Sequence, residues 1–474
     1  MFAVLGAGIT GLSVALKASE EGLSATVIEK APHVGGMASS FVHSFEGKEY
    51  ILDYGPHKIY TTLPRSLGFM KNVLDGDLLE KPKKAKIRFQ GKYFEYPIKI
   101  GEILFGLGIP QTVQFGASFA ASMVSSQSEE TYKGYLEKRF GRKIYETIFR
   151  DLAQKVWGDP ETLDAELAKA RLAAKSLPEM VSKLLLPQSG GREISAKVFY
   201  YPKFGIGQLS DEMAHAVEKK GGTIFLSSQP SKIQLQDGKA KSISFSVKGS
   251  KGDAESQVVE PEFVFSTIPL SDLVSLFSPK APEEVLNAAS RLKYRSLILL
   301  YVIARKERLF DDSFIFFPEK EFVFNRLSEQ KGFSEYCGPK ETTVLCAEIS
   351  TDAGSRLYEA SDKEIFEFAW PSLEKTGFIE RKDVASFFTK RSKRVYPVYD
   401  LGFKKNLRTV LDWLDGIENL FTLGRQGLFN YNNTDHCVDM ALSAFDNLKA
   451  NGMRRSLPAW KKERERFENY VIVD

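Results

Sequence analysis

Six residues near the start of the chain have the types and spacing that hold a phosphate group. Residues 6–11, Gly-Ala-Gly-Ile-Thr-Gly, stand between an apolar segment at 2–5 and a segment with helical apolar spacing at 11–20. In such a motif the first glycine permits a tight turn, and the second lets the backbone approach a diphosphate. The third lets helix and strand pack closely. The N-terminus of the following helix favours the anion.

Glu29 turns this weak signal into a stronger one. It ends a second apolar segment, residues 25–28, about twenty residues after the motif, where a carboxylate holds ribose hydroxyls. The pattern predicts a βαβ unit that binds a dinucleotide. The expected contact residues of this unit are Gly6, Gly8, Ile9, Thr10, Gly11, Glu29 and Lys30.

The segment after Glu29 indicates which dinucleotide binds. Residues 34–39, Val-Gly-Gly-Met-Ala-Ser, resemble the extended fingerprint of FAD enzymes in the amine oxidase and glutathione-reductase-like superfamily. The resemblance implies FAD as a non-covalent cofactor, with Gly35, Gly36, Met37 and Ala38 as further contacts. An ordinary Gly-Gly turn is the alternative interpretation. No second G-x-G-x-x-G follows a strand, so a separate NAD(P)H domain is not expected.

Eight further segments resemble, in the same order, the UDP-galactopyranose mutase branch of this superfamily. They are DYGPHKIYT at 53–61, FEYPI at 94–98, KVWG at 155–158 with KAR at 169–171, YP at 201–202 with GIG at 205–207, YRSL at 294–297, NR at 325–326, YPV at 396–398, and GR at 424–425 with Tyr431 and Asp435. Each segment alone is a modest signal. Eight in one order make chance a poor explanation.

The resemblance implies a role for individual residues. It places His57 against the isoalloxazine, Trp157 by the nucleotide subsite and Arg326 at the substrate diphosphate. It adds three residues to the flavin site, which are Gly424, Arg425 and Asp435.

A diphosphate carries about two negative charges and needs arginine or lysine donors in a partly dry cleft. Arg171, Lys175 and Arg326 are candidate donors, and Tyr396 and Tyr431 offer phenolic hydrogen bonds. The expected catalytic residues are therefore His57, Lys175, Arg326, Tyr396 and Tyr431, and the expected substrate-binding residues are Trp157 and Arg171.

Simpler interpretations stand beside these. Trp157 in an amphipathic helix is also a typical core residue, and His57 in a Gly-Pro-His turn is also a typical solvated loop residue. Cys437 raises the question of a covalent flavin link, but the local pattern does not match one. Two positions depart from the mutase pattern, because Lys175 stands where mutases carry a second arginine and Gln208 stands where they carry a tyrosine.

Two reactions fit these motifs. The first is a ring interconversion of a nucleotide sugar through N5 of reduced FAD, as in the mutases. The alternative is an FAD-dependent oxidoreductase of the amine oxidase or protoporphyrinogen oxidase type, which accepts a hydride from an amine or apolar substrate. The uncharged stretch at 103–128 and the 35 phenylalanines favour the second reaction. A non-catalytic nucleotide sensor is disfavoured, because a flavin held by so many residues normally does chemistry.

The elements that carry these residues predict an α/β protein. We expect a Rossmann-like, glutathione-reductase-like FAD domain assembled from residues 1–80, 199–268 and 415–452. We expect a helical subdomain at 100–198, an antiparallel substrate sheet from 81–99 and 269–414, and a helical tail at 453–474. Residues 290–400 are expected to be mainly strands, Thr434 to cap a helix, and the charged tail to be solvated.

Composition sets the remaining bounds. The chain has 474 residues, with 65 Lys and Arg against 61 Asp and Glu. This balance argues against a nucleic-acid-binding protein. Three cysteines with no metal spacing favour a reducing, cytoplasmic compartment and no metal site, and no signal peptide is expected. The uncharged stretch at 103–128 is read as a loop and a buried or interfacial helix, so peripheral membrane contact stays open. The expected partner is a small molecule, and the oligomeric state is not predicted.

Overall fold

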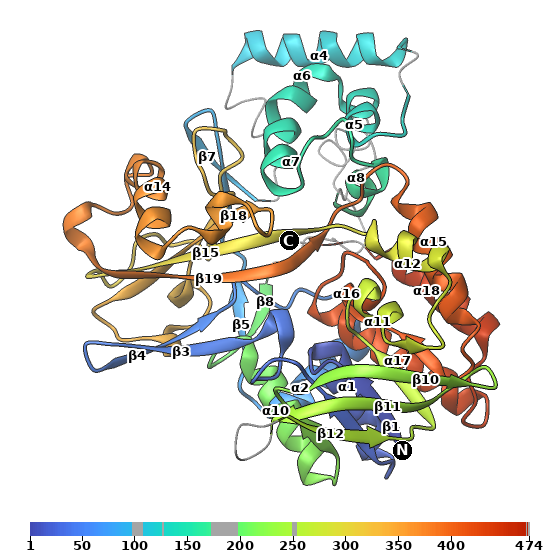
Figure 1. The fold of residues 1–474 in the computed structure, drawn as a ribbon. Helices are drawn as coiled ribbons and strands as arrows, with labels where there is room; N and C mark the ends of the chain where they lie inside the picture. Colours follow the sequence, from blue (N-terminus) through green and yellow to red (C-terminus); the bar gives the residue numbers. More distant parts are fainter. Residues whose placement is uncertain (97–107, 126–127, 172–197, 249–253, 471, 473–474) are drawn as a thin grey trace.

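A five-stranded parallel sheet forms the base of the protein (Figure 1). The computed structural model describes residues 1–96, 108–125, 128–171, 198–248, 254–470 and 472. The strand order is β20-β13-β1-β2-β9, and every pair in it is parallel. The strands are β1 (Phe2–Leu5), β2 (Ala25–Ile28), β9 (Thr223–Phe225), β13 (Phe263–Ser266) and β20 (Leu420–Thr422). They come from distant parts of the chain, so this domain is assembled from discontinuous segments.

Both faces of the parallel sheet are covered, which explains why its inner strands are buried along their whole length. Helix α1 (Ile9–Glu20) packs on β1 and β2 and is flanked by α10 (Gly207–Lys219) and α17 (Thr434–Ala450). A four-stranded sheet, β12-β11-β10-β14, forms a further layer, and the rings of Phe225 and Phe245 pack 5.1 Å apart between the two sheets. Its strands are β10 (Gln229–Gln236), β11 (Lys239–Lys248), β12 (Ala254–Val259) and β14 (Phe277–Ser278).

A seven-stranded, mainly antiparallel sheet forms the second domain. Its order is β19-β15-β18-β17-β16-β6-β7, and only β16 and β6 run parallel. The strands are β6 (Ala85–Phe89), β7 (Lys92–Glu95), β15 (Tyr294–Ala304), β16 (Phe314–Phe316), β17 (Arg326–Glu329), β18 (Thr343–Thr351) and β19 (Val384–Pro397).

The expectation of strands across residues 290–400 is wrong in one stretch. Residues 356–375 form α13 (Arg356–Glu359) and α14 (Asp362–Lys375). A capping box between Ser361 and Glu364 starts α14, and buried residues at helical spacing, including Phe366 and Leu373, pack against the sheet. These local signals are stronger than the strand propensity around them.

A helical subdomain lies at the far end of the molecule from β1 (Figure 1). Its helices are α4 (Ile109–Met123), α5 (Tyr132–Phe140), α6 (Arg142–Ile144), a π-helical turn (Tyr145–Phe149), α7 (Arg150–Val156) and α8 (Ala165–Arg171). Lys155 anchors α7 to the seven-stranded sheet, because its Nζ donates to the carbonyls of Phe317 and Phe324 at 2.6 and 3.1 Å. This anchor fixes the end of α7, just before Trp157.

The remaining elements connect and enclose these layers. They are the pairs β3 (Ser40–Phe45) with β4 (Lys48–Asp53) and β5 (Leu78–Pro82) with β8 (Val198–Pro202), and helices α2 (Pro64–Leu74), α11 (Leu270–Ser275), α12 (Glu283–Ser290), α15 (Phe403–Asp415), α16 (Gly424–Gly427) and α18 (Leu457–Glu468). The expectation that the tail at 453–474 is solvated needs correction. Helix α18 packs on α17 and buries Trp460 and Phe467. Two apolar residues outweigh the many charges of this segment.

Candidate active site

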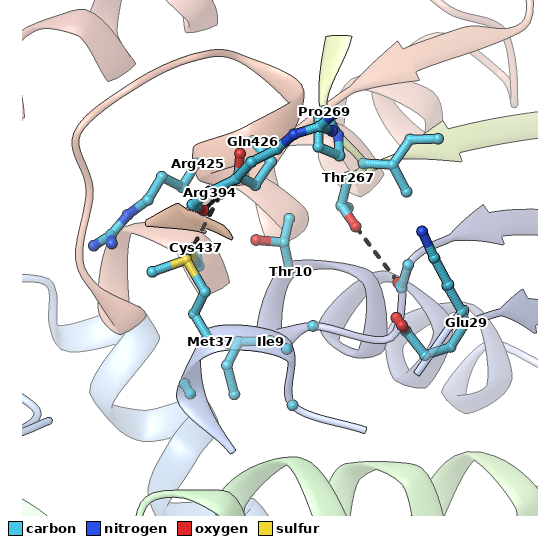
Figure 2. A pocket seen from close by; sticks show the side chains of 18 of the residues that line it. Ile9, Thr10, Glu29, Met37, Thr267, Pro269, Arg394, Arg425, Gln426 and Cys437 are labelled. Carbon is cyan, nitrogen blue, oxygen red and sulfur yellow. Dashed lines mark hydrogen bonds between the residues drawn. The ribbon is translucent and has the colours of Figure 1, made fainter. Parts of the chain in front are cut away.

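A cavity of about 650 Å³ opens where the parallel strands end (Figure 2). Its lining includes Gly6, Glu29 and Thr267, which directly follow β1, β2 and β13, and Gly424, which stands two residues after β20. Ligands of open α/β sheets bind at this carboxyl edge. The volume lies within the range of about 300–1,000 Å³ that is typical of small-molecule sites.

The three motif glycines occupy the positions that a diphosphate requires. Gly6 has φ of +100°, and a Cβ there would lie 2.5 Å from Thr267 Oγ1. A Cβ on Gly11 would lie 2.0 Å from the Gly6 carbonyl, so only glycine lets α1 pack this closely on the turn. A Cβ on Gly8 would meet nothing within 4 Å, because Gly8 faces the open cavity at the start of α1. These observations fit a bound FAD diphosphate.

Glu29 and the second glycine pair complete this cradle. The Ala7 N–H donates to Glu29 Oε2 and the Ala31 N–H donates to Glu29 Oε1, both at 2.7 Å. The Gly35 N–H donates to the Ala7 carbonyl at 2.8 Å and closes the second loop over the first. The expected cofactor residues that line the cavity are Gly6, Gly8, Ile9, Thr10, Glu29, Lys30, Gly35, Gly36, Met37, Ala38, Gly424 and Arg425.

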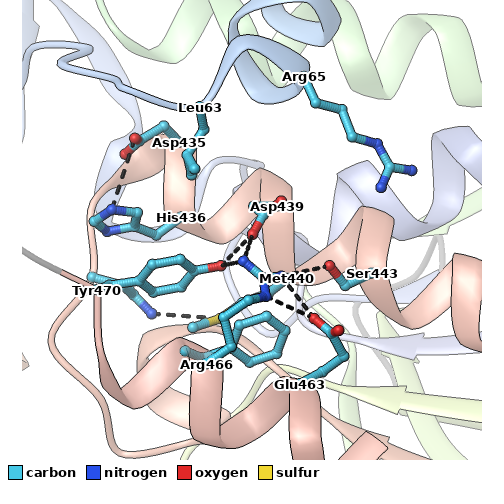
Figure 3. Close-up of polar contacts among 12 residues, drawn as sticks. Leu63, Arg65, Asp435, His436, Asp439, Met440, Ser443, Glu463, Arg466 and Tyr470 are labelled. Atoms are coloured by element: carbon cyan, nitrogen blue, oxygen red, sulfur yellow. Dashed lines mark hydrogen bonds and ion pairs between the residues drawn. The ribbon is translucent and has the colours of Figure 1, made fainter. Parts of the chain in front are cut away.

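Asp435 is not among the residues that line the cavity. Arg425, the other polar residue of the segment that the resemblance assigns to the flavin, does line it. Asp435 is 2% exposed and lies near Leu63 and His436 (Figure 3). Its Oδ1 has no hydrogen-bond partner within the described part of the chain, and burial raises the pKa of its carboxyl to about 6. Asn433, not Thr434, is the N-cap of α17, and its N–H donates to His436 Nδ1 at 3.1 Å.

Polar and ring contacts hold the C-terminal segment against α17 (Figure 3). Arg466 Nη1 donates to Asp439 Oδ2 at 2.6 Å, and the Tyr470 hydroxyl donates to the same carboxylate. The ring of Tyr470 stacks on His436 at 4.1 Å. The tail thereby supports the first turns of α17, next to the residues that line the cavity.

Several residues of the cavity were not expected from the sequence. They are Gln229, Pro230, Thr267, Ile268, Pro269, Asp272, Arg394 and Gln426, among others. Thr267 directly follows β13, just as Gly6 directly follows β1. Its position at the end of a parallel strand was therefore a signal that it lines the cavity. Arg394 had no such signal. Its Nη1 donates to Asp272 Oδ2 at 2.6 Å, which links β19 to α11 at the cavity.

His57 lies in the cavity lining as a neutral imidazole. Its Nδ1–H donates to the Gly55 carbonyl at 2.9 Å, which leaves Nε2 unprotonated. Burial, together with the positive charges of Arg425 and Arg326, lowers the pKa of His57 to about 4. His57 is therefore not a cation near neutral pH.

The loop that carries His57 is fixed by the buried Asp53. The Asp53 carboxylate accepts hydrogen bonds from Ser40 Oγ at 2.6 Å, the Tyr201 hydroxyl at 2.5 Å and the Ile206 N–H at 3.1 Å. Its backbone carbonyl accepts one from the Tyr301 hydroxyl of β15 at 2.5 Å. Burial nevertheless raises the pKa of Asp53 to about 6. The network joins β3, β4 and β8 to β15 of the seven-stranded sheet, next to the loop that carries His57.

The expected substrate residues come together from three separate parts of the chain. The Arg171 guanidinium lies 5.6 Å from the Trp157 ring and 5.9 Å from the Tyr431 ring. The rings of Tyr396 and Tyr431 are stacked 6.3 Å apart. Lys175 lies outside the described residues.

Tyr431 and Arg326 both have internal partners. The Tyr431 hydroxyl donates to the Pro397 carbonyl at 2.8 Å. Arg326 donates to both carboxylate oxygens of Glu348, a residue of β18 that is 1% exposed. The positive charge of Arg326 still acts on Tyr396 and His57, because it favours a lower pKa for each of these side chains. Arg326 therefore belongs to the cluster, but its charge is shared with Glu348.

Cys437 lines the cavity as a protonated thiol. Its Sγ donates to Asn432 Oδ1 at 3.4 Å, and burial raises its pKa. A thiol that is not ionised is a poor nucleophile. The site thus fits a flavin held without a covalent bond at this residue.

Comparisons with known proteins agree with this geometry. The family model described as "Flavin containing amine oxidoreductase" matches residues 9–399. A crystal structure of reduced UDP-galactopyranose mutase superposes with a TM-score of 0.78 at 19% identity, over 96% of this chain and 98% of that one. A double mutant of putrescine oxidase superposes with a TM-score of 0.66 at 15% identity, over 95% and 98%. At these identities the superpositions show the fold.

The chain is also similar in sequence to a curated relative. It is named "Probable UDP-galactopyranose mutase", from Klebsiella pneumoniae, and is 22% identical over 183 residues. The match spans 35% of this chain and 43% of the relative's length.

Proposed function

The chain belongs to the flavin-containing amine oxidoreductase family, with FAD as cofactor, and we propose that it rearranges a nucleotide-sugar-like substrate as UDP-galactopyranose mutases do. One observation carries this proposal, namely the cluster of cations and aromatic rings beside His57 and the cavity. Its members are Trp157, Arg171, Arg326, Tyr396 and Tyr431. Reduced FAD, when bound, would supply a nucleophilic electron pair at N5 and leave each cycle unchanged.

The arginines are the groups that suit a departing diphosphate. Arg171, Arg326 and Arg425 all lie close enough to Tyr396 to lower its pKa against the effect of burial. Charge-assisted hydrogen bonds from such a set stabilise negative charge as it develops on a leaving diphosphate. Orientation and charge then matter more than a side-chain base.

Trp157 suits the nucleotide base. It is 6% exposed, and its ring nitrogen has no hydrogen-bond partner within the described ranges. A buried N–H without an acceptor is unfavourable. An oxygen of a bound nucleotide would satisfy it while the base stacks on the ring.

His57 contributes position and not charge. Its unprotonated Nε2 is able to accept a hydrogen bond from a ligand in the cavity, and its low pKa prevents it from acting as an imidazolium near neutral pH. The arginines nearby thus supply the positive charge of the site, and His57 adds none to it.

Two observations favour a second function. Glu348 offsets the charge of Arg326, and Gln208, at the position of the mutase tyrosine, bonds instead to Asp77 Oδ2 at 2.9 Å. A site with less free charge suits the alternative of an FAD-dependent oxidoreductase acting on an amine or an apolar substrate. In either case the three free cysteines suit a reducing, cytoplasmic compartment.

Nucleotide binding to the holoprotein tests the proposal. UDP should perturb the flavin spectrum, and Trp157→Ala should weaken UDP by about 5–100-fold, the usual effect of losing one stacked base. Trp413→Ala is the control. Trp413 is a residue of α15 that packs against Phe277, so it is not a member of the proposed substrate cluster. UDP that fails to bind, or that binds equally to the Trp157 variant, contradicts the proposal.

A further inference from the structure

The outer face of α4 is unusual for a helix that contacts water. The helix packs on α5 and α6 through a narrow stripe that includes Phe115 and Ser122. Outside this stripe Val113 is 64% exposed, Met123 66% and Val124 89%. Such a face normally carries charged residues.

No charge interrupts this face. Residues 103–128 contain no Asp, Glu, Lys or Arg. The other exposed residues of α4 are Pro110, Gln114, Gly116, Ala117, Ala120 and Ala121. Large apolar patches of this kind mark interaction sites.

Two exposed cations lie close to α4, at the start of the helix α6 that packs on it. The backbone of α4 lies against Gly141, since a Cβ there would be 2.7 Å from the Phe119 nitrogen, and the Lys143 N–H donates to Ser118 Oγ. Arg142 and Lys143 therefore start at the surface of α4, with side chains 75% and 55% exposed. Both cations pair with Glu146, which is less exposed than they are. One carboxylate balances only one of the two positive charges.

We propose that the exposed face of α4, together with Arg142 and Lys143, binds the surface of an anionic phospholipid membrane. The apolar side chains enter the boundary of the acyl chains, and the two cations meet the lipid phosphates. Within the described ranges no helix is both long and apolar enough to cross a bilayer, so α4 lies in the plane of the interface.

The position of α4 suits this role. It is the outermost helix at the end of the molecule opposite the dinucleotide-binding sheet (Figure 1). The subdomain that presents it also carries Trp157 and Arg171 of the substrate cluster. A membrane at α4 would leave the cofactor domain in water. The inference stands independently of which reaction the site performs.

Flotation of the holoprotein with vesicles tests this inference. Vesicles of phosphatidylcholine with phosphatidylglycerol should carry the protein upward, and pure phosphatidylcholine should carry less. Met123→Glu with Val124→Glu should abolish flotation. Val258→Glu is the matched control, because Val258 is 60% exposed on β12 and far from α4.

The cations provide a second, independent arm. Arg142→Gln with Lys143→Gln should lower the affinity for the anionic vesicles by about fivefold for each cation removed, and should leave binding to phosphatidylcholine unchanged. Retained flavin absorbance reports an intact fold. Absence of flotation with both vesicles, or equal flotation of the Met123/Val124 variant, overturns the inference. A dimer that this variant dissociates, with no vesicle binding, assigns the face to a second copy and also overturns it.

Discussion

The Arg326 guanidinium and the Glu348 carboxylate form a two-point ion pair, with Nε 2.5 Å from Oε2 and Nη2 2.9 Å from Oε1. The pair joins neighbouring strands of the seven-stranded sheet, and Glu348 is almost fully buried. It holds the guanidinium in one orientation beside Tyr396. The same pair limits the net charge that Arg326 offers to a substrate, so its removal is informative for function.

Arg326→Ala is expected to weaken binding of UDP by about 2–4 kcal/mol, the usual loss when one partner of a desolvated charge pair is removed. The FAD content should be unchanged, because Arg326 does not line the cavity. Calorimetric titration of UDP and the ratio of flavin to protein absorbance check both statements.

Arg308→Ala is the control for this variant. Arg308 also pairs with a buried carboxylate, Glu329, at 3.1 Å, but at a different place in the same domain. It should lower stability without changing the affinity for UDP. Loss of FAD from the Arg326 variant would instead place Arg326 in the cofactor site.

Gly8→Val is expected to prevent FAD binding, because the space above Gly8 belongs to the cavity. Gly68→Val is a matched control, since a Cβ there also meets nothing within 4 Å but Gly68 does not line the cavity. The purified variants are compared by colour and by flavin released on heating. A yellow Gly8 variant would show that the diphosphate lies elsewhere.

Asp272→Asn is expected to speed the release of FAD by up to about fivefold, the range of an exposed ion pair. The Asp272–Arg394 pair joins α11 to β19 at the cavity, so its loss loosens the contact between the two domains. Stopped-flow fluorescence of released FAD measures the rate, and added salt should remove the difference. Glu367→Gln, which breaks the remote exposed pair with Arg381, should release FAD at the wild-type rate. Equal rates for both variants would refute a role for Asp272.

Asp53→Asn is expected to change how stability depends on pH. Burial raises the pKa of Asp53 from 3.8 to about 6, so the folded state binds the proton more tightly than the unfolded state. The stabilising contribution of this carboxyl is present below pH 3.8 and is lost as pH rises through 6. Wild type should therefore lose about 3 kcal/mol relative to the variant between pH 3.8 and 7. Urea unfolding of both proteins over this range measures the difference, and parallel curves would contradict the assignment.

The cofactor cradle was predictable from the sequence because its determinants are local. Gly6, Gly8, Gly11 and Glu29 belong to one βαβ unit, and each position has a steric or hydrogen-bonding reason that sequence spacing records. The family model confirms the flavin cofactor. The discontinuous α/β architecture also agrees with the expectation.

Contacts between distant segments were not predictable. The pair of Arg394 with Asp272 exists only because β19 is brought against α11, and neither residue has a local pattern that indicates it. The burial of Trp460 reversed the expectation of a solvated tail for the same reason. The gathering of Trp157 with Tyr431 was expected only through the family resemblance, since nothing in their spacing requires it.

Turnover with oxidised and with reduced holoenzyme tests the central claim most directly. UDP-galactopyranose is supplied without oxygen, and the sugar product and the flavin absorbance are followed together. We expect dithionite-reduced enzyme to change the ring form of the sugar without consuming reductant, and oxidised enzyme to be inert. If an amine or a porphyrinogen bleaches the oxidised flavin stoichiometrically while no nucleotide sugar is rearranged, the mutase-like function is contradicted.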